Sequence, residues 1–156
     1  MNLPYARTGI AALSLSATAF VGLTAYEGYR DKAYIPVPGD VPTIGFGTTE
    51  GVKLGDTTTP QAAMQRALQD VSKFEGAVKQ CVTVPLHQHE YDAFIQLSYN
   101  IGQTAFCKST LVKKVNALDY AGACIEILQW DRFKGKPLRG LAIRRQKEFN
   151  LCTGAK

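Results

Sequence analysis

An uncharged stretch of 19 residues, from Thr8 to Tyr26, restricts the fold of this 156-residue chain more than any other feature. A helix needs about 20 apolar residues to span a bilayer, so the stretch is just long enough. However, Ala, Gly, Ser and Thr fill 12 of the 19 positions. Because the stability of a helix in lipid grows with its apolar surface, this segment should insert only marginally and should be extractable.

Three interpretations of this N-terminal segment remain open. It could be a cleaved signal peptide, since Ala17-Thr18-Ala19 has the form of a small-residue cleavage site. It could be a permanent anchor, which its low hydrophobicity disfavours. We favour a third interpretation, in which residues 1–25 are an uncleaved export segment that later leaves the membrane and joins the fold. Under this interpretation the fold includes an N-terminal hydrophobic helix.

The composition is that of a folded protein with a mild basic bias. Hydrophobic residues make up 46% of the chain, which argues against disorder, and the length suits one domain with a single core. Lys and Arg number 18 against 13 Asp and Glu, giving a net charge of +5. This charge suits an anionic partner such as nucleic acid, a phospholipid surface or a cell-wall polymer. Nucleic acid is disfavoured because the chain has no long run of Lys and Arg.

Four cysteines, Cys81, Cys107, Cys124 and Cys152, are spread over the second half of the chain. None has the CxxC spacing of a zinc ribbon or of a thioredoxin-type redox site. They are either reduced thiols of a cytosolic protein or two disulfides formed in an oxidising compartment. The export segment favours disulfides. Three connectivities are open, and our working prediction is Cys81–Cys107 with Cys124–Cys152.

The remainder of the chain predicts a small β lobe followed by helices. After Gly28, a region rich in Gly, Pro and β-branched residues predicts a hairpin or three-stranded ribbon, with turns at Pro38-Gly39-Asp40 and Glu50-Gly51. Thr59 and Pro60 have the residue types of an N-cap and a first helical residue. The helix that they open has one apolar face, formed by Met64, Leu68, Val71, Phe74 and Val78. Further helices are expected at about 87–100, 109–117, 119–130 and 137–152. The fold class is therefore α+β, with a cleft between the lobes where a polymer could lie.

Metal-dependent and serine-dependent chemistry find little support in the sequence. His87 and His89 are the only histidines. Spaced i and i+2, they are expected to point to different faces of a helix and so not to share a metal. No GxSxG motif of a serine hydrolase is present. The GFG within "TIGFGTT" is not a phosphate-binding loop, because it lacks a third glycine and does not lead into a helix.

A carboxylate is the remaining candidate for catalysis. Glu27 is the first carboxylate of the chain, and it lies between the apolar segment and the glycine-rich ribbon. A partly apolar pocket raises the pKa of a carboxyl group, which is what a general acid needs near neutral pH. Asp31 and Asp40 are the next carboxylates along the chain.

The stretch "EGYRDKAY…GDVPTIGFGTT" resembles the active-site signature of phage-type lysozymes, the muramidase endolysins. Their pattern is Glu-Gly-x-Arg…Ala-Tyr, then an Asp, then Thr-Ile-Gly-Tyr-Gly. Downstream, "PLHQHEYDAFIQLSYNIG", "STLVKKVNALDYAGACIEILQW" and "GLAIRRQKEF" are similar to later segments of the same family. The resemblance covers nearly the whole chain from Tyr26 onward, with several motifs in the same order.

The resemblance implies a lysozyme-like fold and hydrolysis of the β-1,4 bond between N-acetylmuramic acid and N-acetylglucosamine in peptidoglycan. Glu27 would be the catalytic acid, and Thr43 would help to hold the attacking water. The usual position of the aspartate, two residues after the tyrosine of Ala-Tyr, is Pro36 here. Asp40 is therefore the candidate base or stabiliser, with Asp31 in reserve. Inversion of the anomeric centre is expected, and no metal or cofactor is implied.

Asn100, Arg144 and Arg145 are the candidate substrate-binding residues, also by resemblance. Combined with the N-terminal segment, the family suggests an endolysin of the signal-arrest-release kind, with residues 1–25 as the export segment and 26–156 as the catalytic domain. It would be a monomer of the host periplasm, first tethered to the inner membrane and released on depolarisation, with no nucleic-acid partner. A lytic transglycosylase acting on the same bond and a membrane-tethered, non-catalytic peptidoglycan-binding module remain the alternatives.

Overall fold

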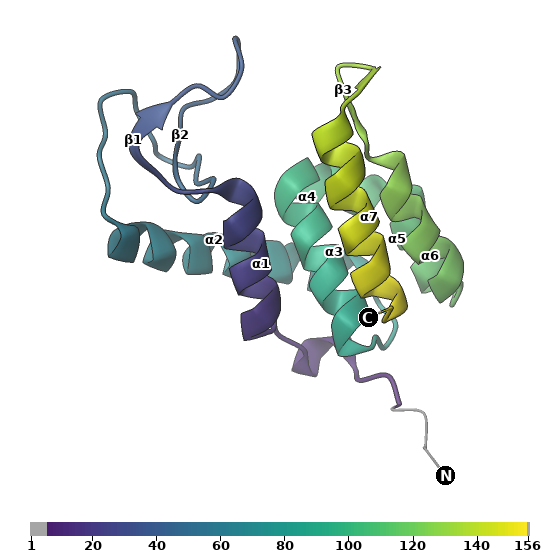
Figure 1. The fold of residues 1–156 in the computed structure, drawn as a ribbon. Coiled ribbons are helices and arrows are strands. Elements are labelled where there is room, and N and C mark those ends of the chain that lie inside the picture. The colour runs from purple at the N-terminus through teal and green to yellow at the C-terminus, as the bar shows by residue number, and fades with distance from the viewer. Residues whose placement is uncertain (1–5, 156) are drawn as a thin grey trace. The chain divides into compact units, whose positions relative to one another are not determined.

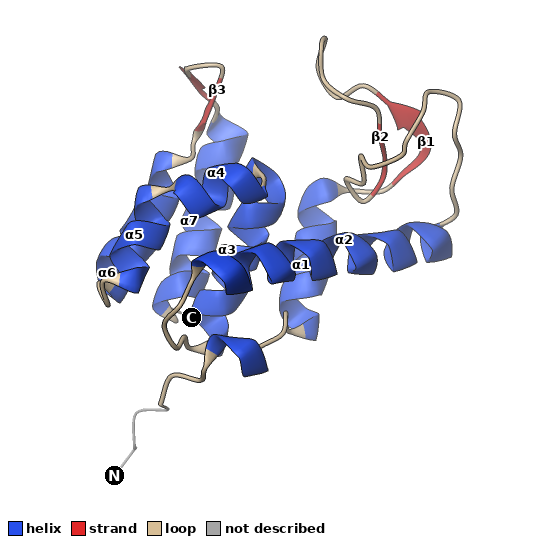
Figure 2. Ribbon diagram, turned by 180° about the vertical axis from the view of Figure 1, so that it is seen from behind, coloured by secondary structure: helices blue, strands red, loops and turns tan. Residues whose placement is uncertain are grey.

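The computed structural model describes residues 6–155 of the chain. The chain forms two compact units, one made of Phe20–Lys73 and the other made of the segments on either side of it. Helices α1 (Ala17–Glu27) and α2 (Pro60–Cys81) each begin in one unit and end in the other (Figure 1). The predicted α+β class is confirmed: helices dominate, and the strands are few and short (Figure 2).

A small antiparallel sheet forms the centre of the Phe20–Lys73 unit. Strands β1 (Arg30–Tyr34) and β2 (Thr43–Gly45) pair with Arg30 opposite Gly45 and Tyr34 opposite Thr43. Two isolated bridges, Lys32 with Thr57 and Ile44 with Thr48, extend the ribbon. The turns predicted around Pro38-Gly39 and at Glu50-Gly51 are present. The predicted ribbon is therefore confirmed as a two-stranded sheet with added bridges.

Helix α2 begins where the sequence predicted, because Thr59 Oγ1 accepts a hydrogen bond from the Ala62 amide at 3.2 Å and Pro60 takes the first helical position. The predicted apolar face was wrong in its first half. Met64 and Leu68 are 38% and 50% exposed.

The small side chains Ala63 and Ala67 are the buried residues of that first half. A Cβ added at Gly45 of β2 would lie only 2.8 Å from the Ala63 Cβ, so the strand approaches the helix too closely for a larger residue. Farther along α2, Val71 and Val78 are buried as predicted.

The other unit is helical. Its helices are α3 (Gln88–Ile101), α4 (Gln103–Lys108), α5 (Thr110–Asn116), α6 (Tyr120–Glu126) and α7 (Arg139–Thr153), with 3-10 turns at Ile10–Ala12 and Ile127–Gln129 and a hairpin of β3 (Arg132–Phe133) and β4 (Lys136–Pro137). Helix α3 packs against α4 and α7, and its residues 90–98 are all buried. Its Phe94 packs against Phe106 of α4, with ring centroids 6.0 Å apart.

Local capping explains most of these helix boundaries. Ser109 and Asp119 accept hydrogen bonds from the amides of Val112 and Gly122, and Gly102 ends α3. Helix α4 and the β3–β4 hairpin were not predicted. Both elements are only a few residues long, too short to show a periodicity that a pattern search detects.

Two disulfides join the helices, Cys81 to Cys107 and Cys124 to Cys152, with Cα–Cα separations of 5.5 and 5.7 Å. The predicted pairing is confirmed. The first links the end of α2 to α4, and the second links α6 to α7. Each closes a loop of 26 or 28 residues, which stabilises the fold by about 3.5 kcal/mol in the chain-entropy account.

The N-terminal segment does not form the single hydrophobic helix that the sequence suggested. Thr8 instead forms a β-bridge with Leu86, a 3-10 turn follows, and α1 begins only at Ala17. The amide of Leu15 donates to Glu75 Oε1 at 2.6 Å, and the amide of Ser16 donates to Asp92 Oδ1 at 3.0 Å. These carboxylates bind amides just before α1 and fix its starting point. Within residues 6–155, every helix is too short or too polar to cross a membrane.

Candidate active site

The candidate acid Glu27 is the last residue of α1 and is half-buried. Gly28 follows at φ +67°, and its amide donates to the Thr24 carbonyl, so the helix ends there. The chain then turns into β1. This arrangement places the carboxylate at the junction of an apolar helix and the glycine-rich ribbon, as the sequence predicted.

Gly47, in the turn after β2, lies against the Glu27 carboxylate. A Cβ added at Gly47 would lie 2.9 Å from Glu27 Oε2 and 3.3 Å from Glu27 Cδ. Its φ of +86° also disfavours any side chain. The backbone of this turn therefore forms a wall of the carboxylate's site. The sequence analysis included Gly47 in the lysozyme-like signature but gave it no role of its own, although its place in "TIGFG" was a signal that could have identified it.

Thr43, the first residue of β2, is buried. Its hydroxyl donates to the carbonyl of Val41 at 3.2 Å. Because the hydroxyl proton is used in this way, the oxygen lone pairs are oriented to accept a hydrogen bond. A hydroxyl held in this manner can accept a hydrogen bond from a water molecule and fix the orientation of that water.

Asp40 lies in the loop between β1 and β2 and is exposed. Its amide donates to the Val37 carbonyl at 3.0 Å, and its Oδ1 accepts from the Val41 amide at 2.9 Å. The side chain is therefore held at the end of the loop that leads into Thr43. Asp31 is also exposed but lies in β1, where its carbonyl accepts from the Thr58 amide.

The three candidate substrate-binding residues belong to the helical unit, where Glu148 brings them together. Arg145 is fully buried; its Nη2 donates to Asn100 Oδ1 at 2.9 Å and its Nε lies 2.9 Å from Glu148 Oε2. Arg144 Nε donates to Glu148 Oε1 at 3.0 Å. Sequence reasoning missed Glu148. The signal was present, since a carboxylate at i+3 and i+4 from two arginines faces both of them on a helix.

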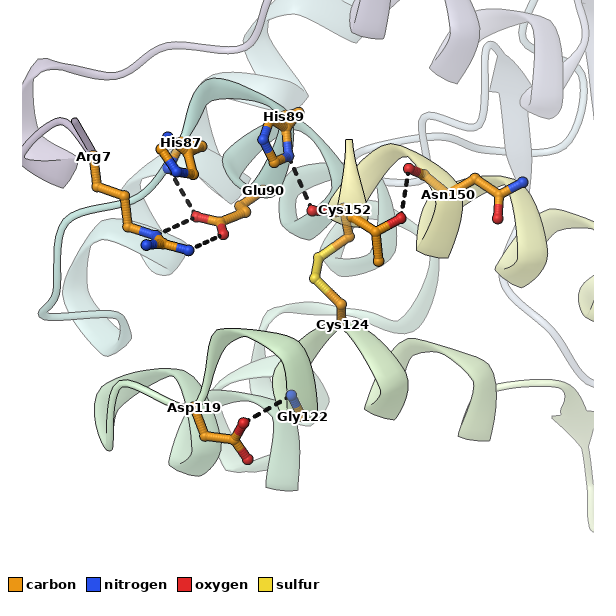
Figure 3. The surroundings of a disulfide bond; sticks show 10 residues. Arg7, His87, His89, Glu90, Asp119, Gly122, Cys124, Asn150 and Cys152 are labelled. Atoms are coloured by element: carbon orange, nitrogen blue, oxygen red, sulfur yellow. Dashed lines mark hydrogen bonds and ion pairs between the residues drawn. A yellow bond between two sulfur atoms is a disulfide. The ribbon is translucent and has the colours of Figure 1, made fainter. Parts of the chain in front are cut away.

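His87 and His89 lie closer together than expected. Their rings stack with centroids 5.2 Å apart, because His87 is the N-cap of α3 and not a residue inside the helix. His89 Nδ1 is bonded to the carbonyl of Cys152 at 2.9 Å (Figure 3). The expectation that they point to different helix faces was therefore wrong. Among the described residues, no three His, Cys, Asp or Glu side chains are grouped so that they could hold a metal ion.

Comparisons with known proteins place the chain in the lysozyme-like class. The fold is similar to the solved endolysin from Escherichia coli O157:H7 phage FAHEc1, with a TM-score of 0.80 and 34% identity over 93% of this chain and 96% of that one. The sequence is 40% identical to the endolysin of Acyrthosiphon pisum secondary endosymbiont phage 1, over 92% of this chain and 100% of that protein. It is 35% identical to the SAR-endolysin of Pseudomonas phage phiKMV, over 97% of this chain and 92% of that protein.

The phage lysozyme family model matches residues 24–148, and the chain belongs to this family. It is a glycoside hydrolase, a muramidase that cleaves peptidoglycan during host lysis. The alternative of a non-catalytic binding module is therefore wrong.

Proposed function

We propose that Glu27 is the general acid that protonates the glycosidic oxygen between N-acetylmuramic acid and N-acetylglucosamine. The observation that carries the proposal is the contact between its carboxylate and the Gly47 backbone. The Gly47 backbone lies so close to the carboxylate that it leaves no room for a side chain between them and restricts where the carboxylate can move. A catalytic group must be held in place to within about half an ångström to be effective.

Asp40 and Thr43 are proposed to act on the attacking water. A glycosidic bond breaks through a transition state with positive charge on the sugar. A second carboxylate can stabilise this charge, or it can activate a water molecule that attacks the sugar. The hydroxyl of Thr43, already donating to Val41, accepts from the water, and Asp40 takes its proton. Attack by water on the face opposite the leaving group inverts the anomeric centre.

Asn100, Arg144 and Arg145 are proposed to contribute to substrate binding. The support is their common network around Glu148, in which Arg145 fixes the Asn100 side chain through its oxygen. The Asn100 amide nitrogen, with two donor hydrogens, is then oriented by this contact. In this proposal Arg145 acts mainly by positioning Asn100, because Arg145 itself is fully buried.

The exposed Asp40 is the feature that would also fit a lytic transglycosylase, so the reaction products test the role proposed for Asp40 in hydrolysis. Such an enzyme needs only one acid/base group, because a hydroxyl of the sugar itself attacks. Asp40 is exposed and lies four residues beyond the position that the aspartate takes in the family. Chromatography of the sugars released from purified peptidoglycan separates the two candidates. We expect reducing ends of inverted configuration, and 1,6-anhydro ends would exclude our proposal.

We also propose that residues 1–25 first tether the chain to the inner membrane and later release it into the periplasm, where it acts as a monomer. Two features support this: the phiKMV relative is named a SAR-endolysin, and Thr8–Tyr26 has no charge. In the fold described here, the segment is bound by α3 side chains, with Gln96 Nε2 donating to the Ala19 carbonyl at 3.0 Å. This fold corresponds to the released state in our proposal.

Arg7 gives the release a dependence on membrane potential. Positive residues favour the cytoplasmic side of a membrane, so Arg7 would remain there while the segment is inserted. To reach its partner Glu90 it must then cross the bilayer. Moving one positive charge outward against the potential costs about 2.3 kcal/mol per 100 mV. Depolarisation removes this cost and favours release.

A further inference from the structure

The β3–β4 hairpin is an exposed projection of the helical unit. It extends beyond the start of α7 in both ribbon views (Figures 1 and 2). Arg132 pairs with Pro137, and Phe133 pairs with Lys136. The two-residue turn between them has positive φ at both positions, 49° at Lys134 and 77° at Gly135, which is the geometry of a tight hairpin turn. Residues 132–140 are all exposed.

The turn places a lysine in a conformation that side chains other than those of Gly, Asn and Asp rarely adopt. Lys134 thus takes a strained position at the tip of the hairpin. Its Nζ lies 5.4 Å from the centroid of the Phe133 ring. A cation is therefore displayed beside an exposed aromatic ring.

The hairpin and the first turn of α7 carry a high positive charge. Four cations, Arg132, Lys134, Lys136 and Arg139, fall within eight consecutive residues, and residues 132–143 include no Asp or Glu. The adjoining carboxylate, Asp131, lies 3.8 Å from the Nε of Arg132. The projection is thus suited to an anionic surface.

Apolar side chains lie among these cations. Phe133 and Leu138 are 41% and 45% exposed. The Leu138 amide bonds to the Asp131 carbonyl, which continues the register of the hairpin. Because side chains alternate between the two faces of a strand, Phe133 and Leu138 lie on the same face. Ile143, one turn into α7, is 50% exposed.

We propose that this hairpin and the first turn of α7, residues 132–143, dock on an anionic phospholipid surface. The cations would bind the headgroups, and the three apolar side chains would enter the interface between headgroups and acyl chains. A hydrophilic wall polymer would neutralise the cations but would leave Phe133 and Leu138 in water. A lipid surface accommodates both properties. This binding adds to the hydrolytic activity and would keep the released enzyme near the membrane.

The test is sedimentation of the full chain with vesicles of equimolar phosphatidylglycerol and phosphatidylcholine, compared with vesicles of phosphatidylcholine alone. Each basic residue near an anionic surface is worth about fivefold in partitioning. The double variant Lys134→Gln with Lys136→Gln should therefore bind about 25-fold more weakly to the anionic vesicles. The matched control, Lys53→Gln with Lys113→Gln, removes two exposed lysines elsewhere and has the same net charge, +5 − 2 = +3. It should bind within about twofold of the parent chain.

The variant Phe133→Ser with Leu138→Ser tests the apolar part, and we expect it to lose the binding that persists at high salt. The control for the hydrolytic proposal is Glu27→Gln, which should bind vesicles like the parent chain. Equal binding of the parent to neutral and anionic vesicles, or equal losses in the two lysine double variants, would overturn the proposal. So would a hairpin variant that loses binding only to lipid-free sacculi, because the hairpin would then be a wall-binding element.

Discussion

The guanidinium of Arg7 forms a bidentate ion pair with the carboxylate of Glu90, with Nε–Oε2 and Nη2–Oε1 distances of 3.1 and 2.7 Å (Figure 3). The same guanidinium lies 3.5 Å from the centroid of the Tyr120 ring. Its hydrogen bonds with Glu90 raise the pKa of Arg7 above its usual value. Glu90 also accepts from the amide of His87 at 2.8 Å and so completes the cap of α3. One buried carboxylate therefore joins the N-terminal segment to the start of the central helix.

Replacing Glu90 with Gln should destabilise the protein by about 2 kcal/mol, measured by urea unfolding. Breaking a fully buried ion pair costs about 3–5 kcal/mol. The Arg7 side chain is 31% exposed, so solvent screening reduces the loss. Arg7→Gln should cost a similar amount, and the double variant should cost less than the sum. The control is Lys114→Gln, which breaks a more exposed pair with Glu126 and should cost less than about 1 kcal/mol. If the losses of Glu90→Gln and Arg7→Gln were fully additive in the double variant, the two side chains would not be coupled.

Among the candidate carboxylates, Glu27→Gln should nearly abolish clearing of chloroform-permeabilised Gram-negative cells. General acid catalysis contributes about 10²–10⁴-fold, and Gln cannot donate a proton in this way. Asp40→Asn should cause a large loss as well. Asp31→Asn, which removes the carboxylate in β1, should have little effect and serves as the control. Full activity of Asp40→Asn would remove Asp40 from the mechanism.

Gly47→Ala should lower activity at least about 100-fold. The added methyl group would lie 2.9 Å from Glu27 Oε2, which is too close, so the carboxylate would have to move. The strained backbone adds about 1–2 kcal/mol of destabilisation. Gly51→Ala is the matched control: its φ is +70°, and nothing lies within 4 Å of an added Cβ. It should lose similar stability and keep its activity. Equal activity losses in the two variants would mean that backbone strain, and not contact with Glu27, is responsible.

Local signals predicted the elements whose boundaries depend on neighbouring residues. Thr59 and Pro60 start α2, Ser109 and Asp119 cap the short helices, and Gly102 ends α3. In each case a side chain bonds to a backbone amide a few residues away, or a glycine takes a conformation that ends the helix. Such interactions can be recognised in the sequence because both partners are close together in it.

The N-terminal segment could not be predicted in this way. Glu75 and Asp92 bind the amides of Leu15 and Ser16, which lie 60 and 76 residues earlier in the chain. Only the last part of the helix start is local, where Ser16 Oγ accepts from the Ala19 amide. The same limit applies to the site. The motif singled out Glu27 as the candidate acid, whereas its closeness to Gly47 depends on how the ribbon folds back over the helix end.

The stability of the protein should decrease as the pH falls below about 6.5, in part because of His87. Burial lowers the pKa of His87 below its usual value of 6.5, with Arg7 and His89 also lowering it and Glu90 opposing them. Between the folded and unfolded pKa values, the unfolded chain binds more protons, so acid favours unfolding. The stability that neutral His87 contributes is fully present above pH 6.5. It is lost as the pH falls through the lower pKa that His87 has in the folded protein. In urea titrations at several pH values, His87→Gln should show a smaller loss than the parent. Identical pH profiles would exclude this role.

The membrane-held form of the protein should hydrolyse peptidoglycan at least about 100-fold more slowly than the released form. In the proposed tethered state, with residues 8–25 in the bilayer, Ala19 cannot accept from Gln96 and Ser16 cannot bond to Asp92, so these two contacts no longer position the helix that ends in Glu27. Displacement of a catalytic group by about 1 Å already costs about 100-fold. The measurement is to separate membranes from energised cells, assay them on purified sacculi, and repeat the assay after a protonophore has released the protein. Glu27→Gln gives the background rate. Equal specific activity of the two fractions would show that the N-terminal segment does not control the site.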